Sequence, residues 1–264
     1  MASRADHAGS GLPADAPDGQ PPALGGVRES LPAAPGLRSG LRRALQEFYF
    51  NSWRLVPANL VWGAGLLGLY VVANVAPVLA IVALPLLALP TVGLFRLAAL
   101  IARDEPAALG DAFAAWRRFG GAALVIGTAA VVALVVFSAN VVTGVASGGV
   151  LGWGLATLAG WGLAMTGLVL LAAWPLLVDP WRAELGLRAR LRLGALMVLA
   201  SPGRLVTLGL LCAIILAVST VAFAALVMVS VAFVAMLASM VVLPAADRLE
   251  ARLGGPVRRA PIDE

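Results

Sequence analysis

The run Leu205–Ala246, LVTLGLLCAIILAVSTVAFAALVMVSVAFVAMLASMVVLPAA, decides the fold of this protein, because its 42 residues include no formal charge. A helix that crosses the hydrocarbon core of a bilayer needs about 20 apolar residues. The run is therefore too long for one crossing, and it has the length of two crossings joined by a tight turn. We expect that turn near Thr220–Met228.

The rest of the chain has the same character. Of its 264 residues, 61% are hydrophobic and 12% are charged, and its mean hydropathy is +0.93, whereas about a quarter of the residues of a soluble domain are charged. The sequence therefore predicts an all-α polytopic membrane protein with six transmembrane helices. The four further spans are expected at about Ala58–Ala76, Val78–Ala102, Ala122–Val142 and Gly149–Val178. The second contains Pro85 and Pro90, so it should be kinked.

The charged residues predict the orientation of the spans. All 19 basic residues are arginines, and in a six-span chain their clusters fall on one side, at 38–54, 96–118, 179–204 and 248–259. The connections of the opposite side carry no charge. Positive charge stays in the cytoplasm during insertion. We therefore expect a multi-pass protein of the bacterial cytoplasmic membrane with both termini in the cytoplasm.

Three segments on the charged side are predicted to be short amphipathic helices at the inner interface, each leading into a span. They cover 41–56, 107–119 and 180–199, and Asp179-Pro180 provides an N-cap and a first-turn proline for the third. The expected organisation is a disordered tail over 1–37, a transmembrane domain over 41–250 and a disordered tail over 251–264.

Small residues recur in the fourth span. Within GWGLATLAGWGLA (152–164) the Gly-x-Gly motif lacks the strand and loop of a phosphate-binding unit. Gly148, Gly152, Ala156, Gly160 and Ala164 instead form a ridge at every fourth position, which favours close helix packing in lipid. We expect this span at the centre of the bundle, with Gly152 and Gly160 as packing residues and Trp161 in a neighbouring groove. A homodimer contact through the same ridge is the alternative.

The sequence offers no catalytic constellation. No span centre carries a charge, Cys212 is the single cysteine and there is one histidine, so we expect neither an enzyme nor a bound metal or cofactor. The arginines flank apolar spans and form no continuous basic face, which excludes nucleic acid as a partner despite the pI of about 10.9. The lipid bilayer is the expected partner.

Two polar residues near the spans are candidates for function. Arg96 follows the kink of the second span, and it is expected to reach the inner headgroups as a lipid anchor or to serve a functional role. Asn59 begins the first span, and it is expected to cap a helix or bond a neighbouring helix, with a functional role as the alternative.

Two stretches give the chain a resemblance to a known family. FYFNSWRLVPANLVW (48–62) and PTVGLFRLAALIARDEPAALGDAFAAWRRF (90–119) resemble the YesL family of bacterial integral membrane proteins, a domain of unknown function. The resemblance implies a six-span protein that assists a carbohydrate ABC importer, and it carries over no catalytic residue. We therefore expect a non-enzymatic accessory or scaffold protein that contacts importer subunits. The alternative is a permease or channel for a neutral or anionic small solute.

Overall fold

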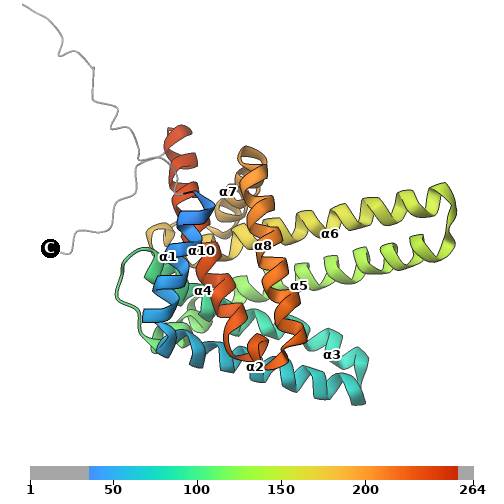
Figure 1. Ribbon diagram of the computed structural model, residues 1–264, viewed down its shortest axis with the longest axis horizontal. Coiled ribbons are helices and arrows are strands. Elements are labelled where there is room, and N and C mark those ends of the chain that lie inside the picture. Colours follow the sequence, from blue (N-terminus) through green and yellow to red (C-terminus); the bar gives the residue numbers. More distant parts are fainter. Residues whose placement is uncertain (1–35, 255–264) are drawn as a thin grey trace, which may run out of the picture. The chain divides into compact units, whose positions relative to one another are not determined.

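The computed structural model describes residues 36–254, which form helices joined by short connections, with no strand within that range. Of the predicted tails 1–37 and 251–264, residues 1–35 and 255–264 lie outside the described residues, and α10 continues to Arg252. Helices occur at α1 (Leu37–Phe50), α2 (Ser52–Val75), α3 (Pro77–Ala83), η1 (Leu84–Leu87), α4 (Ala88–Ala102), α5 (Leu109–Ser147), α6 (Gly149–Val178), η2 (Pro180–Arg182), α7 (Leu187–Ala200), α8 (Pro202–Val221), α9 (Phe223–Ala225), η3 (Leu226–Ser230) and α10 (Val231–Arg252) (Figure 1).

Six of the helical stretches are long and apolar enough to cross a membrane, which confirms the predicted fold class. The long run divides into α8 and the α9–η3–α10 stretch at Ala222, inside the predicted turn. The second span is interrupted as expected, because Leu84–Leu87 tightens into a 3-10 turn around Pro85 between α3 and α4. The six spans are Ser52–Val75, Pro77–Ala102, Leu109–Ser147, Gly149–Val178, Pro202–Val221 and Phe223–Arg252.

Of the three predicted short helices, two form separate helices and one is part of a longer helix. Leu37–Phe50 and Leu187–Ala200 are separate helices, and the first begins four residues before the predicted start at Leu41. The segment 107–119 is not a separate helix, because α5 runs without a break from Leu109 to Ser147. The Asp111 carboxylate accepts a hydrogen bond from the Ala108 N–H at 2.7 Å and so marks the start of this long helix.

The sixth span, and not the fourth, lies at the centre of the packed helices. In the sixth span 72% of the most apolar stretch is buried, against 44% in α6, so the expectation for the fourth span was wrong. α10 packs against α1, where Gly40 fits closely against Val241 and the Phe48 and Phe233 rings meet edge to face at 5.6 Å. It also packs against α4 and α6.

The small-residue ridge of α6 makes a close contact only in its first half. A Cβ added at Gly152 would lie 2.5 Å from the Gly144 carbonyl oxygen of α5, whereas a Cβ added at Gly160 would meet no atom within 4 Å. Trp161 is 63% exposed, so it does not fill a groove as predicted. The ridge therefore tightens the tip of the α5–α6 hairpin, and Gly160 is not a packing residue within the described chain.

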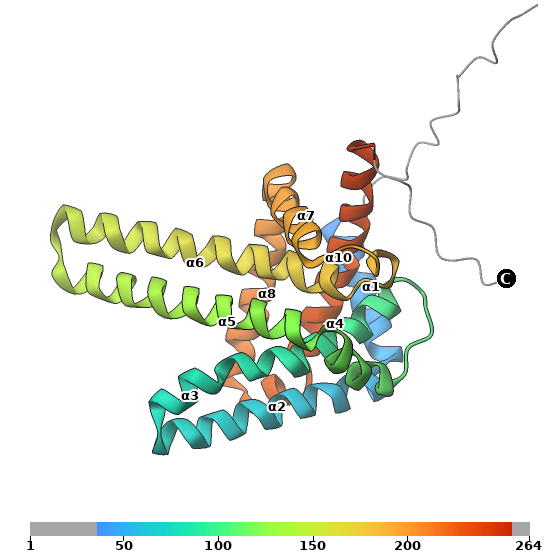
Figure 2. The ribbon, with the colours of Figure 1, turned by 180° about the vertical axis from the view of Figure 1, so that it is seen from behind.

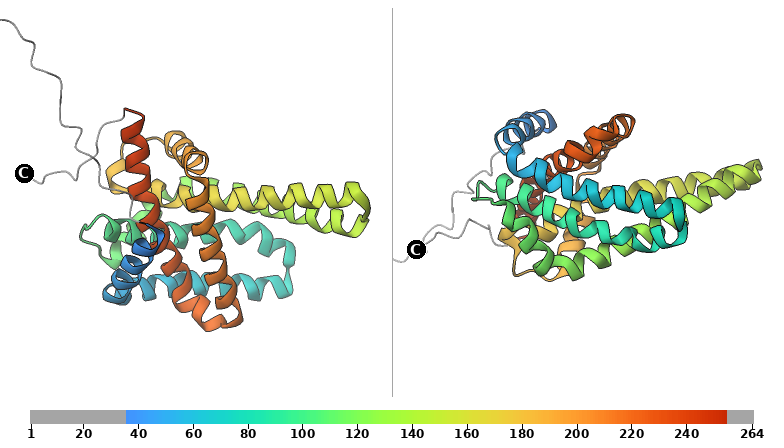
Figure 3. Two further views of the ribbon diagram at one scale, coloured as in Figure 1. Left: turned by 45° about the horizontal axis from the view of Figure 1, so that its top comes forward. Right: turned by 90° about the horizontal axis from the view of Figure 1, so that it is seen from below.

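The two long hairpins and the last span pair run in different directions. α5 and α6 lie side by side in an antiparallel hairpin that extends beyond the α2–α3 hairpin (Figures 2 and 3). α8 and α10 cross these hairpins instead of running alongside them (Figures 1 and 2). As a result, Leu226–Ser230 at the tip of the last pair contacts the first half of α2.

Candidate functional site

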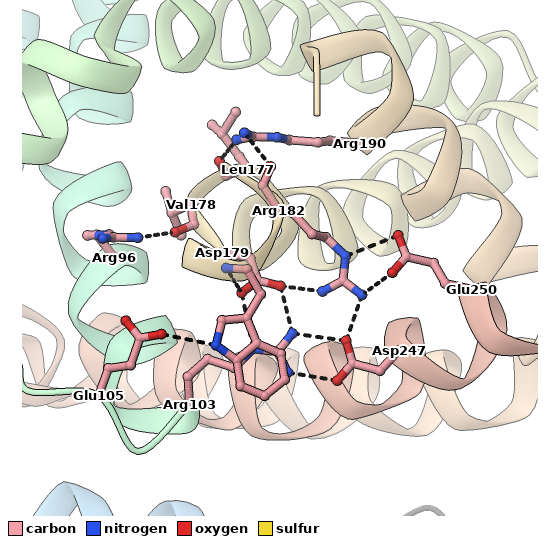
Figure 4. Close-up of polar contacts among 11 residues, drawn as sticks. Arg96, Arg103, Glu105, Leu177, Val178, Asp179, Arg182, Arg190, Asp247 and Glu250 are labelled. Carbon is pink, nitrogen blue, oxygen red and sulfur yellow. Dashed lines mark hydrogen bonds and ion pairs between the residues drawn. The ribbon is translucent and has the colours of Figure 1, made fainter. Parts of the chain in front are cut away.

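Charged residues from four separate segments meet in a buried cluster at the ends of α4, α6 and α10. Arg103 follows α4, Asp179 follows α6, Arg182 ends η2, and Asp247 and Glu250 lie in the last turns of α10 (Figure 4). We call these five residues the ion-pair cluster. Arg103, Asp179 and Arg182 have side chains 5%, 0% and 0% exposed, so the cluster is largely removed from water.

Local sequence fixes the position of Asp179. Its carboxylate accepts a hydrogen bond from the Trp181 N–H at 3.2 Å, and Pro180 occupies the first helical position, so the predicted N-cap is present. It caps only the short turn Pro180–Arg182, however, because α7 does not begin until Leu187. This turn directs both Asp179 and Arg182 into the cluster.

Arg103 makes two forked contacts. Its Nε and Nη2 donate to Asp179 at 3.1 and 2.7 Å, and its Nη1 and Nη2 donate to Asp247 at 2.7 and 3.0 Å. The Trp181 ring lies 3.9 Å from the Arg103 guanidinium carbon, and the Trp181 Nε1 donates to Glu105 at 3.0 Å. The planar guanidinium thus has a carboxylate on two edges and an aromatic ring on its face.

Arg182 is the second bridging cation. It donates to Asp179, to Asp247 at 2.7 Å and to Glu250 at 2.8 and 3.3 Å. Asp179 and Asp247 therefore each bind both arginines, which joins the end of α6 to α4 and α10. Breaking one member would leave a buried charge without compensation.

Two further arginines cap the last carbonyls of α6. Arg190 of α7 donates to the Leu177 oxygen, and also to the Arg182 and Ala183 oxygens at 2.7 and 3.0 Å. Arg96 of α4 donates to the Val178 oxygen at 2.7 Å. The C-terminal carbonyls of a helix lack partners within the helix and carry partial negative charge, so cations there are favourable.

The electrostatics of the cluster keep its arginines charged. Burial alone would lower the pKa of Arg103, but its hydrogen bonds to Asp247 and Asp179 outweigh burial and raise that pKa above the usual value. The pKa of Arg182 is also raised, because attraction to Asp179 and Asp247 outweighs its burial. Since each carboxylate of the cluster is bound to a guanidinium, none is placed to act as a general base.

Asn59 forms a second polar contact, which we call the Asn59 clamp. The side chain is fully buried, and its Nδ2 donates to the Leu226 and Val227 oxygens at 3.1 and 2.6 Å. Its Oδ1 accepts from the Ala232 N–H at 2.7 Å. These groups belong to η3 and the first turn of α10, where the backbone winds as a π-helix. The inter-helix bond expected of Asn59 is thus present, and it satisfies backbone groups at this irregular turn.

The four residues singled out by sequence do not form one site. Arg96 lies at the edge of the ion-pair cluster and donates to the Val178 oxygen at the end of α6, and its role as a lipid anchor stays a prediction. Asn59 lies at η3, and Gly152 lies near the tip of the α5–α6 hairpin. The cluster itself was missed, and the one signal in the sequence was that Asp179 and Asp247 directly follow long apolar runs. Within residues 36–254 no group of three or more His, Cys, Asp or Glu side chains is placed to hold a metal ion.

The chain matches no family model, and no curated protein or solved structure matches it significantly.

Proposed function

We propose that this integral membrane protein is a non-enzymatic accessory or scaffold component, placed in the bacterial cytoplasmic membrane with both termini in the cytoplasm. The observation that carries the proposal is the ion-pair cluster. It joins the ends of α4, α6 and α10 through five ion pairs among Arg103, Arg182, Asp179, Asp247 and Glu250. Helix ends joined in this way favour a rigid arrangement of the helices, which suits a scaffold better than a transporter that changes conformation.

The polar groups of the spans support the same proposal. The Asn74 and Asn140 amides donate to carbonyls four residues earlier in their own helices, and the Thr166 and Ser219 hydroxyls do the same. Polar side chains whose hydrogen bonds are made within their own helix do not indicate a pathway for a solute. Arg96, which a permease could use to attract an anion, is engaged by the Val178 oxygen.

The charged end offers a surface for a partner. Arg117 and Arg118 in α5 and Arg188 and Arg192 in α7 are exposed beside the cluster-bearing helices. We assign this surface to a cytoplasm-facing contact with subunits of a carbohydrate ABC-type uptake system, on the basis of the resemblance of 48–62 and 90–119 to the YesL family. The permease or channel for a small solute is the competing function.

Cross-linking in native membranes tests the proposal. Importer subunits should be cross-linked to the wild-type chain and lost from a variant in which Arg117, Arg118, Arg188 and Arg192 are all changed to Glu, while both proteins reach the membrane equally. A chain that is cross-linked to no importer subunit would contradict the proposal.

Reconstituted vesicles distinguish the competing function. Vesicles that contain this chain alone should show no flux of sugars or small anions above empty vesicles. Flux that disappears with Arg96→Ala would contradict the scaffold function and support the permease function.

A further inference from the structure

We propose that Arg204 and Arg248 form a binding site for a phosphate group, supplied by the headgroup of an anionic phospholipid, where α8 begins beside α10. The site lies outside the ion-pair cluster and does not depend on the proposed scaffold role. Both residues lie in the described part of the chain, and both belong to the charged ends of the last two spans.

The position of Arg204 is set by a contact with α10. Its Nη2 donates to the Val241 carbonyl oxygen at 3.3 Å, so its guanidinium lies against the backbone of α10. Arg248 follows Val241 by seven residues, which is about two helical turns, or about 10 Å along the axis on the same face. Side chains of a helix lean toward its N-terminus, so Arg248 extends back toward Arg204.

The two cations oppose each other. The charge of Arg248 acts against that of Arg204, and the charge of Arg252, one turn further along α10, acts against that of Arg248. Asp247 offsets part of this repulsion, but its carboxylate is bound to Arg103 and Arg182. An anion held between Arg204 and Arg248 would weaken the repulsion between these two cations.

Arg248 has hydrogen-bonding capacity left over. Its Nη1 is buried and has no acceptor among the described residues, and no carboxylate within 36–254 forms an ion pair with it. A buried donor without an acceptor is costly, and a guanidinium fork matches the oxygens of a phosphate group. The geometry therefore favours phosphate over a small spherical anion.

The start of α8 adds to the attraction. Ser201 makes no side-chain hydrogen bond to the first turn, Pro202 occupies the first position, and Ser201, Pro202 and Gly203 are exposed. The free N–H groups of a helix start carry partial positive charge, and they are open to a ligand here. Arg204 directly precedes the apolar run of α8, so the site lies at the edge of the apolar layer, where lipid phosphates are found.

Native mass spectrometry of the purified full chain tests the site. The probes are phosphatidylglycerol and phosphatidylcholine, and the variant is Arg204→Gln with Arg248→Gln. The control is Arg188→Gln with Arg192→Gln, which removes the same charge from exposed positions of α7. The site variant should bind phosphatidylglycerol roughly 30-fold more weakly than the wild type, from the usual contribution of each arginine near an anionic membrane surface. The control variant should lose much less, and phosphatidylcholine binding should not depend on either pair.

A second titration distinguishes the source of the phosphate. Inorganic phosphate is added to the chain in phosphatidylcholine alone and its binding is followed by calorimetry. If inorganic phosphate binds in an Arg204- and Arg248-dependent manner while phosphatidylglycerol does not, the site takes free phosphate and the lipid assignment is wrong. Equal loss of phosphatidylglycerol in the site and control variants would overturn the site itself. If the Gln variant fails to fold, the variant Arg204→Lys with Arg248→Lys is used, because it keeps both charges. It should lose part of the phosphatidylglycerol binding, because lysine cannot make the forked contact. Full retention of binding by the Lys variant would contradict the forked contact.

Discussion

The ion-pair cluster and the Asn59 clamp both hold the last span to its neighbours, but by opposite means. The cluster uses five charged side chains at the end of α10, whereas the clamp uses one neutral amide at its beginning. Charges are costly to bury away from water and more costly to leave unpaired there. Loss of any one member of the cluster should therefore lower the stability strongly. An amide that bonds backbone groups costs less to bury, and its loss should be milder. The following predictions test this difference.

Asp179→Asn should have the largest effect on stability. The change leaves Arg103 and Arg182 buried with one carboxylate fewer, and uncompensated buried charges cost about 3–5 kcal/mol. The free energy of unfolding in mild detergent, from a denaturant titration, measures the loss. Asp104→Asn is the control, because its ion pair with Arg43 has side chains 75% and 45% exposed, and exposed pairs contribute about 0.2–1 kcal/mol. Equal losses in the two variants would show that the cluster is not a buried structural unit.

Asn59→Leu should have an intermediate effect. The leucine has a similar volume, but it leaves two carbonyls of η3 and the Ala232 N–H without the partners that Asn59 provides. We expect a loss of about 2–3 kcal/mol by the same titration. Asn74→Leu is the matched control, because exposed Asn74 bonds only the Tyr70 oxygen of its own helix. If Asn59→Leu lowers the free energy of unfolding no more than Asn74→Leu does, the Asn59 clamp does not stabilise the fold.

Gly152→Ala should have the smallest effect of the three. The added methyl group would lie 2.5 Å from the Gly144 oxygen, so α5 and α6 must move apart. We expect a cost of about 1–2 kcal/mol, at the low end for overpacking because one methyl group is added. Gly160→Ala meets no atom within 4 Å, and it should be neutral or stabilising because alanine favours the helix. Thermal unfolding of the two variants measures this contrast, and a larger loss for Gly160→Ala would contradict the described packing.

Hydropathy predicted the spans and a turn near Thr220–Met228, which contains the break at Ala222, because both depend on composition along the chain. It could not predict the ion-pair cluster, since Arg103, Asp179 and Asp247 are far apart in sequence and meet only when α4, α6 and α10 pack together. The ridge of small residues in the fourth span led to the wrong span being placed at the centre. Gly152 and Gly160 have the same sequence context, but only Gly152 faces a neighbouring helix, and small residues show that a close approach is sterically allowed without showing that a neighbour is present.

The central proposal is that the helices cross a membrane with the ion-pair cluster on the cytoplasmic side and the α5–α6 tip on the other. Cysteine labelling of intact cells with a membrane-impermeant reagent tests it most directly, in a Cys212→Ser background. Val150→Cys lies at the tip, where Val150 is 91% exposed, and Glu184→Cys lies in the exposed connection beside the cluster. The account predicts that Val150→Cys is labelled in intact cells and that Glu184→Cys is labelled only after the cells are permeabilised. Labelling of both positions in intact cells, or of Glu184→Cys alone, would contradict it.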